Sequence, residues 1–346
     1  MTLAVSYERH DLPLTDAFTI SRGTTETATV HTVSVTDDAG RVGYGAASPS
    51  EYYGETPGSV EAALPNLLDV VESVGDPHAH QRIERRLRSV APDQAAARAA
   101  VSIAIHDLAA RHREEPLYRR WGHDASAAPT TSYTVGIADP EAMAERAAEV
   151  VDDGYPILKV KLGTEADRAR LEAVREAAPE ATIRVDANTA WSPGEAIDHL
   201  DWLADLDIEF VEQPVAADDL SGLARVRDVS PIPIAADESC VTAGDVPAVA
   251  DAVDVVVVKL MKCGGLRAAA RQIAAAHAHD LEVMLGCMVE SDASIAGACH
   301  LSPLVEYADL DGSLLLADDI YTGVPMPNGR IDLSSSASPG TGVRPS

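Results

Sequence analysis

Two lysines separated by one valine, Lys159 and Lys161, end an apolar stretch in the sequence YPILKVKLG. Because side chains on a strand alternate between its two faces, both ammonium groups must point the same way. Like charges so close lower each other's pKa, so we expect at least one of these lysines to be neutral near pH 7 and able to accept a proton. The alternative is a pair of solvated lysines at the end of a strand.

Lysine is rare in the rest of the chain. It occurs only twice more, at Lys259 and Lys262, and arginine provides every other basic position. Arginine cannot lose its proton in proteins, whereas lysine can when its surroundings disfavour the charge. The confinement of lysine to two places therefore favours acid–base chemistry over the solvated alternative.

Three carboxylates follow apolar runs between the two lysine clusters: Asp186 in RVDAN, Glu212 in VEQP and Asp237 in ADES. From Lys161 through these carboxylates to Lys259 the intervals are 25, 26, 25 and 22 residues, each the length of one strand–helix unit. Parallel α/β barrels build their sites at the carboxyl ends of strands, so the five side chains should converge. Converging carboxylates repel one another unless a cation lies between them, and oxygen ligands favour Mg²⁺, which Mn²⁺ can replace. A helix N-cap role explains one such aspartate well but three together poorly.

The two outer lysines should lie on opposite sides of the barrel mouth. A substrate carbon held between them could lose a proton to one lysine and regain a proton from the other, which inverts that carbon. A metal ion holding the substrate carboxylate would stabilise the enediolate formed when the α-proton leaves.

The elements that position these residues follow from the hydrophobic pattern. After residue 128, short apolar runs alternate with amphipathic segments, which predicts an α/β fold of the TIM type, a (β/α)₈ barrel. The predicted strands are Thr131–Ile137, Tyr155–Lys161, Thr182–Asp186, Ile208–Glu212, Ile232–Asp237, Val253–Lys259, Leu281–Cys287 and Val305–Leu310. The predicted helices between them include Pro140–Asp152, Glu165–Ala178, Pro193–Leu206 and Leu266–His279.

The first part of the chain predicts an N-terminal α+β capping domain, because strands are followed by helices without alternation. The predicted elements are a hairpin of Thr29–Val35 and Arg41–Ala46 and helices at Ser59–Val74, His78–Val90 and Gln94–His112. The stretches FTISRGT and SPSEYYGETPG are predicted to be mobile loops. We place the capping domain at 1–118, the catalytic barrel at 119–317 and a segment that returns to the cap at 318–346. The tail from Ser334 is rich in Ser, Pro and Gly, which predicts a surface strap or disorder.

The composition limits the partners of the protein. A formal net charge of −28 repels nucleic acids and anionic membrane surfaces. The chain has no apolar run of membrane-spanning length and no leader-like start, so we expect a cytoplasmic protein, and we predict a homo-oligomer. The acidic, lysine-poor composition suggests the hypothesis of a halophilic source. The four cysteines, Cys240, Cys263, Cys287 and Cys299, show no CxxC spacing and are predicted to be buried free thiols.

The motifs KVK, DAN, VEQP, ADES and KLMKCGG occur in this order. With them the chain resembles the muconate-lactonizing (muconate cycloisomerase) subgroup of the enolase superfamily over nearly its whole length. The resemblance implies the following roles: Lys161 and Lys259 as the acid–base pair, Lys159 as the group that stabilises enolate charge, Asp186, Glu212 and Asp237 as metal ligands, and Asn188 and Glu238 as supports of the lysines and ligands. If the sixth strand ran further than predicted, Lys262 would compete with Lys259 as the base.

Two aspartates at the end of the last strand, Asp309 and Asp311, point the same way because they are two residues apart. They would attract a cationic substrate group and oppose dianions such as muconate or succinylbenzoate. This DLDG resembles the DxD sequence of dipeptide epimerases, whose aspartates hold the α-ammonium group; a solvated acidic turn is the alternative. The resemblance further implies that Arg22 contacts a side-chain carboxylate, as in Ala-Glu epimerases. Thr134 and Met288 are expected to shape the pocket.

We therefore predict a Mg²⁺-dependent dipeptide epimerase, an isomerase that performs 1,1-proton transfer at the α-carbon of the C-terminal residue, with L-Ala-D/L-Glu as an example. Within the subgroup, the alternatives are a muconate-type cycloisomerase, an o-succinylbenzoate synthase and an N-acylamino acid racemase. A Schiff-base aldolase is opposed by the three carboxylates. An inactive carboxylate-binding protein is opposed by the presence of every key position.

Overall fold

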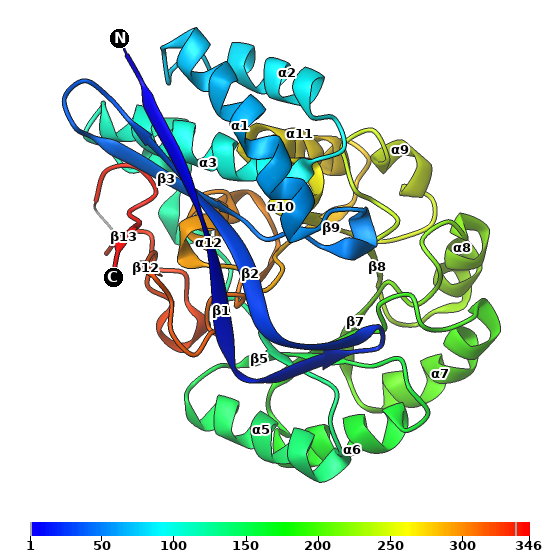
Figure 1. Ribbon diagram of the computed structural model, residues 1–346. Coiled ribbons are helices and arrows are strands. Elements are labelled where there is room, and N and C mark those ends of the chain that lie inside the picture. The colour runs from blue at the N-terminus through cyan, green and yellow to red at the C-terminus, as the bar shows by residue number, and fades with distance from the viewer. Residues whose placement is uncertain (1, 336–337) are drawn as a thin grey trace.

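The computed structural model describes residues 2–335 and 338–346, and its larger part is a parallel barrel (Figure 1). Eight strands form one sheet in the order β4 to β11, and a parallel bridge between Thr131 and Ala308 joins its two edges. The strands are β4 Tyr133–Val135, β5 Ile157–Lys161, β6 Thr182–Asp186, β7 Ile208–Glu212, β8 Ile234–Ala236, β9 Val255–Lys259, β10 Glu282–Gly286 and β11 Tyr307–Asp309. The predicted TIM-type barrel is confirmed.

Helices cover the outside of the barrel and follow the strands along the chain. They are α5 Pro140–Asp152, α6 Asp167–Ala177, α7 Pro193–Asp205, α8 Leu220–Val229, α9 Val246–Val249, α10 Leu260–Cys263, α11 Leu266–His277 and α12 Asp292–Cys299. The start of α7 is specified locally, because the Ser192 side chain accepts from the Glu195 N–H while Glu195 returns a contact to the Ser192 N–H. Inside the barrel, Phe210, Val257 and Met284 are wholly buried beneath the strand ends and form a packed floor.

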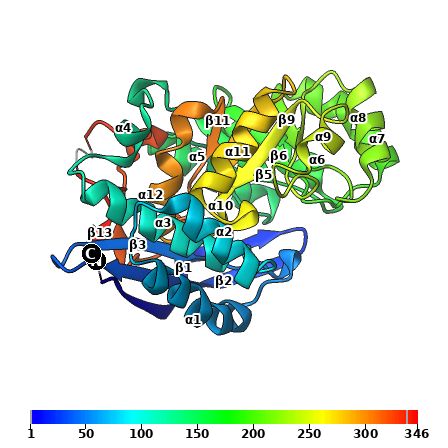
Figure 2. The same ribbon diagram turned by 90° about the horizontal axis from the view of Figure 1, so that it is seen from above.

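The N-terminal cap consists of an antiparallel sheet and three helices that lie along one side of the barrel (Figure 2). Its elements are β1 Ala4–Ile20, β2 Gly23–Thr36, β3 Val42–Ala47, η1 Glu51–Tyr53, α1 Pro57–Val74, α2 His80–Val90 and α3 Ala95–Arg111, followed by α4 Leu117–Trp121 and η2 Ala125–Ala127. Glycines on β3 allow it to approach α3 closely, since a Cβ on Gly45 would lie 2.2 Å from the Ala100 carbonyl oxygen.

One predicted loop of the cap is wrong. The stretch FTISRGT is mostly strand, because β1 and β2 continue into a tight turn at Ser21 and Arg22 with Ile20 opposite Gly23. The predicted hairpin of Thr29–Val35 and Arg41–Ala46 is confirmed by the pairing of β2 with β3, but β2 begins at Gly23 and also forms a second, longer hairpin with β1. Most residues of β1 are exposed, so its sequence lacks the apolar alternation by which a half-buried strand is recognised.

The C-terminal segment packs against the cap. Its elements are β12 Tyr321–Thr322, η4 Pro327–Gly329 and β13 Arg344–Pro345, with β12 and β13 paired, whereas η3 Ser302–Leu304 lies in the barrel between α12 and β11. Residues 340–343 are buried, so the prediction of a surface strap or disorder is wrong for them. Thr341 N–H donates to buried Asp107 on α3 at 2.7 Å. Residues 336 and 337 of the predicted tail lie outside the described residues, and the domain boundaries at 118 and 317 stay predictions.

The cysteines and the helices bear on two further predictions. The four cysteines are free; Cys240, Cys263 and Cys299 are buried, whereas Cys287 is partly exposed. Among the described residues, no helix combines the length and apolar character needed to cross a membrane.

Candidate active site

The register of the barrel strands aligns the predicted site residues. Lys161 at the end of β5 pairs with Asp186 on β6, and Asp186 pairs with Glu212 on β7. Lys259 at the end of β9 pairs with Gly286 on β10. A Cβ on Gly286 would lie 3.1 Å from Lys259 Cε, so glycine there leaves room for the lysine side chain.

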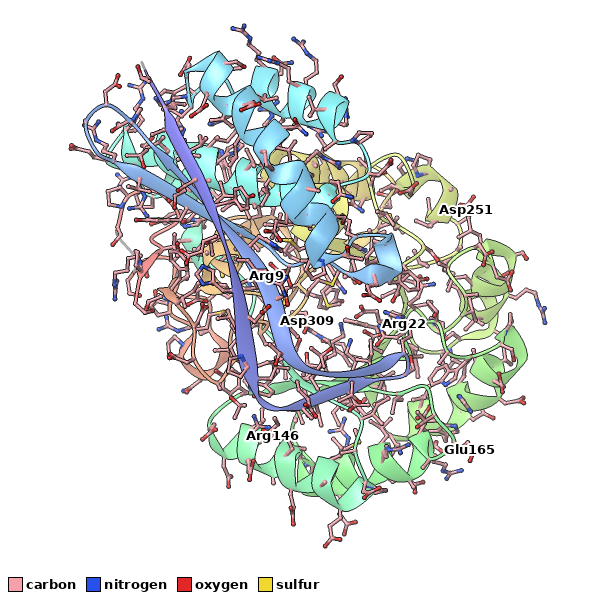
Figure 3. The ribbon with its side chains drawn as sticks, viewed as in Figure 1. Arg9, Arg22, Arg146, Glu165, Asp251 and Asp309 are labelled. Carbon is pink, nitrogen blue, oxygen red and sulfur yellow. The ribbon has the colours of Figure 1, made fainter. Side chains whose placement is uncertain are left out.

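These strand ends open into a cavity of about 420 Å³ beneath the cap hairpin. Figure 3 shows Asp309 inside the barrel under the hairpin and Arg22 at the hairpin tip. The predicted residues that line the cavity are Lys159, Lys161, Lys259, Asp237, Glu238, Asn188, Asp309, Asp311, Thr134, Met288 and Arg22. Asp186 and Glu212 are completely buried and do not line it.

Each of the two outer lysines contacts one carboxylate. Lys161 Nζ donates to Asp186 Oδ2 at 2.6 Å, and Lys259 Nζ donates to Asp237 Oδ2 at 2.7 Å. In the sheet, β6, β7 and β8 lie between β5 and β9, so the two ammonium groups enter the cavity from opposite sides of the barrel.

Lys159 lies deeper and contacts three carboxylates. Its Nζ donates to Asp309 Oδ2 at 2.8 Å and lies 2.7 Å from Glu212 Oε2 and 3.3 Å from Asp186 Oδ2. The side chain is 1 % exposed, so little solvent screens these interactions. Lys159 is therefore a fixed positive charge among the acidic groups.

Within the pair of Lys159 and Lys161, the expectation of a neutral lysine does not hold for Lys159. Burial lowers the pKa of Lys159, but Asp309, Glu212 and Asp186 outweigh it, and the pKa is raised well above its ordinary value. Burial likewise lowers the pKa of Lys259, but the nearby Asp237 carboxylate raises it above the ordinary value. The prediction considered the two ammonium groups of one strand, whereas the carboxylates of the neighbouring strands decide the direction of both shifts.

The predicted metal ligands do not form a ready-made ligand cluster. Among the described residues, no three His, Cys, Asp or Glu side chains are grouped so that they could hold a metal ion, and Lys159 lies among the carboxylates instead. Nevertheless, neither carboxylate oxygen of buried Glu212 has a hydrogen-bond partner in the described part of the chain, and its cationic neighbour is Lys159, whose Nζ forms an ion pair with Oε2. Burial and Asp186 raise the pKa of Glu212 to about 8. Buried, unsatisfied carboxylate oxygens are the donor set that a hard cation such as Mg²⁺ requires, so these residues fit the ion.

Lys262 is not placed to compete as a base. It lies in α10, after β9 has ended at Lys259, and it is 2 % exposed. Its Nζ donates to the Asp237 carboxylate and to the carbonyl oxygens of Cys240 and Val257. These contacts occupy the ammonium group, which does not line the cavity.

Asn188 and Glu238 connect the barrel to the cap. The Asn188 N–H donates to Asp186 Oδ1 at 2.8 Å, and Asn188 Nδ2 donates to Asp186 Oδ2 at 3.2 Å. Arg22 Nη1 donates to Glu238 Oε1 at 2.9 Å and to the Asn188 carbonyl oxygen at 2.8 Å, and its guanidinium stacks on the Tyr52 ring at 4.5 Å. Arg22 therefore binds the rim of the barrel itself, a contact that the sequence did not predict.

The two aspartates of the last strand have different surroundings. Asp309 accepts from Ser132 Oγ at 2.6 Å as well as from Lys159, and these contacts lower its pKa despite burial. Asp311 accepts from the Thr134 N–H at 2.6 Å, and burial together with Asp309 raises its pKa to about 7. Both carboxyl groups face the cavity. Asp309 is ionised and Asp311 ionises near neutral pH, so together they can bind a cationic group.

Sequence reasoning missed two supporting residues. Ser132 lies two positions before Thr134 and so points to the same face, which the alternation of a strand could have revealed. Gln213 follows Glu212 directly, and its Oε1 accepts from the backbone N–H groups of Asp237 and Ser239 at 3.0 Å each. Gln213 thereby positions the loop that presents Asp237.

Comparisons with known proteins agree with this architecture. Residues 4–122 match the mandelate racemase/muconate lactonizing enzyme N-terminal domain, and residues 142–346 match the enolase C-terminal domain-like model. The chain belongs to the mandelate racemase/muconate lactonizing enzyme family of the enolase superfamily. The predicted family is therefore confirmed.

Members of this family with known activities are similar to the chain over nearly its whole length. The L-Ala-D/L-Glu epimerase of Bacteroides thetaiotaomicron is 37 % identical over 343 residues, which cover 99 % of this chain and 88 % of that protein. The hydrophobic dipeptide epimerase of Enterococcus faecalis is 37 % identical, with 90 % of each chain covered. A crystal structure of the dipeptide epimerase from Enterococcus faecalis V583, complexed with Mg and the dipeptide L-Leu-L-Tyr, superimposes with a TM-score of 0.92 at 34 % identity and 99 % coverage of both chains.

Proposed function

We propose that this protein is a Mg²⁺-dependent dipeptide epimerase that inverts the α-carbon of the C-terminal residue of its substrate. The proposal rests on Lys161 and Lys259, which enter one cavity from opposite sides of the barrel. It is supported by family relatives that are dipeptide epimerases at 37 % identity. A carbon held between two such groups can lose a proton to the one that is a neutral amine and gain a proton from the one that is an ammonium ion.

The other cavity residues suit a dipeptide. Asp309 and Asp311 together provide negative charge for the α-ammonium group, while Lys159 remains protonated and stabilises the negative charge that develops as the α-proton leaves. Asp186, Glu212 and Asp237 would hold the Mg²⁺ ion, which when bound supplies positive charge opposite the substrate carboxylate. Asn188 and Glu238 position these groups through the contacts to Asp186 and Arg22.

The proposal leaves the side chains of the dipeptide open. Arg22 could contact a glutamate side chain, as the resemblance implies, only by giving up some of its present contacts with Glu238 and Asn188. L-Ala-D/L-Glu is therefore the first substrate to test rather than an assigned one. Muconate-type and o-succinylbenzoate-type reactions are disfavoured, because Asp309 and Asp311 would repel a second substrate carboxylate.

The decisive experiment is hydrogen exchange with a dipeptide library in D₂O, read by mass spectrometry. We expect one deuterium at the α-carbon of the C-terminal residue together with formation of the epimer. Lys161→Ala and Lys259→Ala should each abolish exchange of one epimer, and a chelator should abolish both until Mg²⁺ or Mn²⁺ is restored.

Matched substrates separate this function from its relatives. N-acetylation of the dipeptide removes the ammonium group that Asp309 and Asp311 would bind, so exchange should fall sharply. An N-acylamino acid racemase would instead prefer the acetylated compound. Unchanged exchange of both epimers in either lysine variant, or full activity with the chelator, would exclude the two-lysine mechanism.

A further inference from the structure

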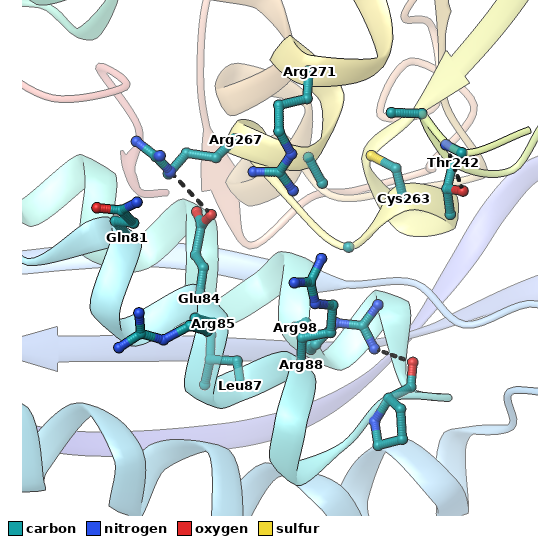
Figure 4. Close-up of a pocket in the computed structure, with 15 residues that line it drawn as sticks. Gln81, Glu84, Arg85, Leu87, Arg88, Arg98, Thr242, Cys263, Arg267 and Arg271 are labelled. Carbon is teal, nitrogen blue, oxygen red and sulfur yellow. Dashed lines mark hydrogen bonds and ion pairs between the residues drawn. The ribbon is translucent and has the colours of Figure 1, made fainter. Parts of the chain in front are cut away.

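A second and larger cavity lies outside the active site, between the cap and the barrel. Its volume is about 780 Å³, and it is bounded by α2 and α3 of the cap, and on the barrel side by α11, by the end of α10 with Gly264, and by the loop at residues 242–244. Figure 4 shows Arg267 and Arg271 extending from α11 toward the cap helices that contain Glu84 and Arg98. Among the described residues, the lining of this cavity shares no member with that of the active site.

The cavity concentrates positive charge in an acidic protein. The lining residues with charged side chains are Arg85, Arg88, Arg98, Arg267, Arg271 and Glu84. Helix α2 contains four arginines and one glutamate in 11 residues, although the whole chain has a formal charge of −28. Such a local excess of one sign attracts ions of the opposite sign.

Little within the protein neutralises these arginines. Arg267 Nε lies 3.4 Å from Glu84 Oε2, whereas Glu84 Oε1 accepts from Ser102 Oγ at 2.8 Å. Among the described residues, the other four arginines of the cavity form no ion pair with a carboxylate. Guanidinium groups gathered around one cavity with a single carboxylate, Glu84, in its described lining repel one another, and an anion between them removes this repulsion.

Arg98 is built into the cavity wall. It is 9 % exposed, and its Nη1 donates to the carbonyl oxygen of Ala91 at 2.6 Å and to that of Pro92. Its Nε and Nη2 have no hydrogen-bond partner in the described residues. Gly264, with φ of 91°, makes room for this guanidinium, since a Cβ there would lie 2.7 Å from Arg98 Nη2. A buried guanidinium with unused donors is a preorganised oxyanion ligand.

We propose that this cavity binds a compact small-molecule polyanion bearing phosphate groups. Guanidinium forks match phosphate oxygens in bidentate geometry, and phosphates place several charges in a small volume, as an arginine-rich cavity requires. No aromatic side chain is among the described residues that line it, so it offers no stacking surface for a nucleobase. The ligand class is thus a diphosphate or a sugar phosphate rather than a nucleotide.

Occupation of the site would join the cap to the barrel. The arginines come from α2 and α3 on one side and from α11 on the other, so a bound polyanion bridges the two parts of the molecule. A ligand that binds only the folded state raises its stability. The polyanion should therefore raise the thermal unfolding midpoint.

The test uses the full chain in metal-free buffer at constant ionic strength, with pyrophosphate as the probe and calorimetry as the readout. We expect pyrophosphate to bind and to raise the unfolding midpoint. Arg88→Gln and Arg271→Gln, at exposed positions on opposite sides of the cavity, should each weaken binding about ten-fold, the loss of a charge-assisted contact. Arg82→Gln is the matched control, because Arg82 is an exposed arginine of α2 that does not line the cavity.

Several results would overturn the proposal. Absence of pyrophosphate binding, or equal affinity in all three variants, would show that the cavity is not the site. With equal affinity, the binding site would instead be the active-site lysines. Tighter binding of citrate than of pyrophosphate would exclude the phosphate class. If Arg88→Gln and Arg271→Gln changed the sedimentation of the protein without changing pyrophosphate affinity, the cavity would be a contact between copies of the chain.

Discussion

The lysines of the active site differ in how firmly the protein holds their charge. Lys159 contacts Asp309, Glu212 and Asp186 and is almost wholly buried, whereas Lys161 and Lys259 contact one carboxylate each. Removing one partner of a buried ionic group leaves the other charges uncompensated. Lys159 should therefore matter for stability as well as for catalysis.

The first prediction concerns Lys159→Met. The buried carboxylates around Lys159 would lose their compensating charge, so the free energy of unfolding should fall by about 3–5 kcal/mol. Lys161→Met, in contrast, should abolish exchange of one epimer with a smaller loss of stability, because Lys161 has a single carboxylate contact. Urea unfolding measures the free energy of unfolding of both variants. Equal losses of stability would contradict the distinction between the two lysines.

The second prediction concerns the pH dependence of substrate binding. The pKa of Asp311 is raised to about 7 by burial and by Asp309, so below that pH the carboxyl group is neutral and binds an ammonium group poorly. The dissociation constant of a dipeptide should rise about ten-fold for each pH unit below 7. Calorimetric titrations across this range provide the measurement.

Asp311→Asn is the control for this pH dependence. The variant should bind dipeptides weakly and show no break in affinity near neutral pH. The same pKa shift affects the free protein: its folded state holds the proton more tightly than its unfolded state, so the Asp311 contribution to stability falls as the pH rises from about 4 to about 7. An affinity independent of pH in the native protein would exclude Asp311 as an ammonium ligand.

At the scale of elements, the hairpin of β1 and β2 reaches the barrel through its tip. Gly163, just after β5, has φ of 109°, and a Cβ there would lie 2.8 Å from Ser21 Cβ and 2.6 Å from Ala190 Cβ. The close contact of the hairpin with the barrel rim thus depends on glycine at this position. Arg22 at the same tip holds Glu238 and Asn188.

The third prediction is that Gly163→Ala will loosen this contact. The positive φ and the crowding should lower the free energy of unfolding by about 1–3 kcal/mol, and displacement of Arg22 should raise KM more than it lowers kcat. Gly58→Ala is the control, because Gly58 lies in α1 without a positive φ, and an added Cβ would meet only Thr56 Oγ1, at an ordinary contact distance of 3.9 Å. A Gly163→Ala variant with native KM would show that the tip does not shape the site.

The elements were predictable where the sequence itself carries a clear apolar pattern. The bounds of α5, β6 and β7 agree with the predicted ranges, because apolar residues alternate with polar ones or recur at helical spacing there. The long β1 was missed, because most of its residues are exposed and its sequence shows no clear apolar pattern. Its hydrogen bonds to β2 hold it in the sheet. Ion pairs such as that of Lys159 with Glu212 join strands distant in sequence, so the spacing of residues along the chain could not reveal them.

At the scale of the whole molecule, the dominant property is the net charge of −28. Many carboxylates on one molecule repel each other, and dissolved salt screens this repulsion. The fourth prediction is that the thermal unfolding midpoint will rise from low to multimolar KCl, as the hypothesis of a halophilic source requires. An unchanged midpoint would contradict that hypothesis. The oligomeric state also stays a prediction, which sedimentation velocity can test.

The contact between α3 and the C-terminal segment has a consequence for biosynthesis. Buried Asp107 accepts from the N–H and hydroxyl groups of Thr341, a partner 234 positions later in the chain. During synthesis the cap helices emerge from the ribosome long before Thr341 does. Until Thr341 emerges, the Asp107 carboxylate lacks two of its hydrogen bonds. We expect the cap to acquire protease resistance only after Thr341 has left the exit tunnel, however early the sheet of the cap has formed.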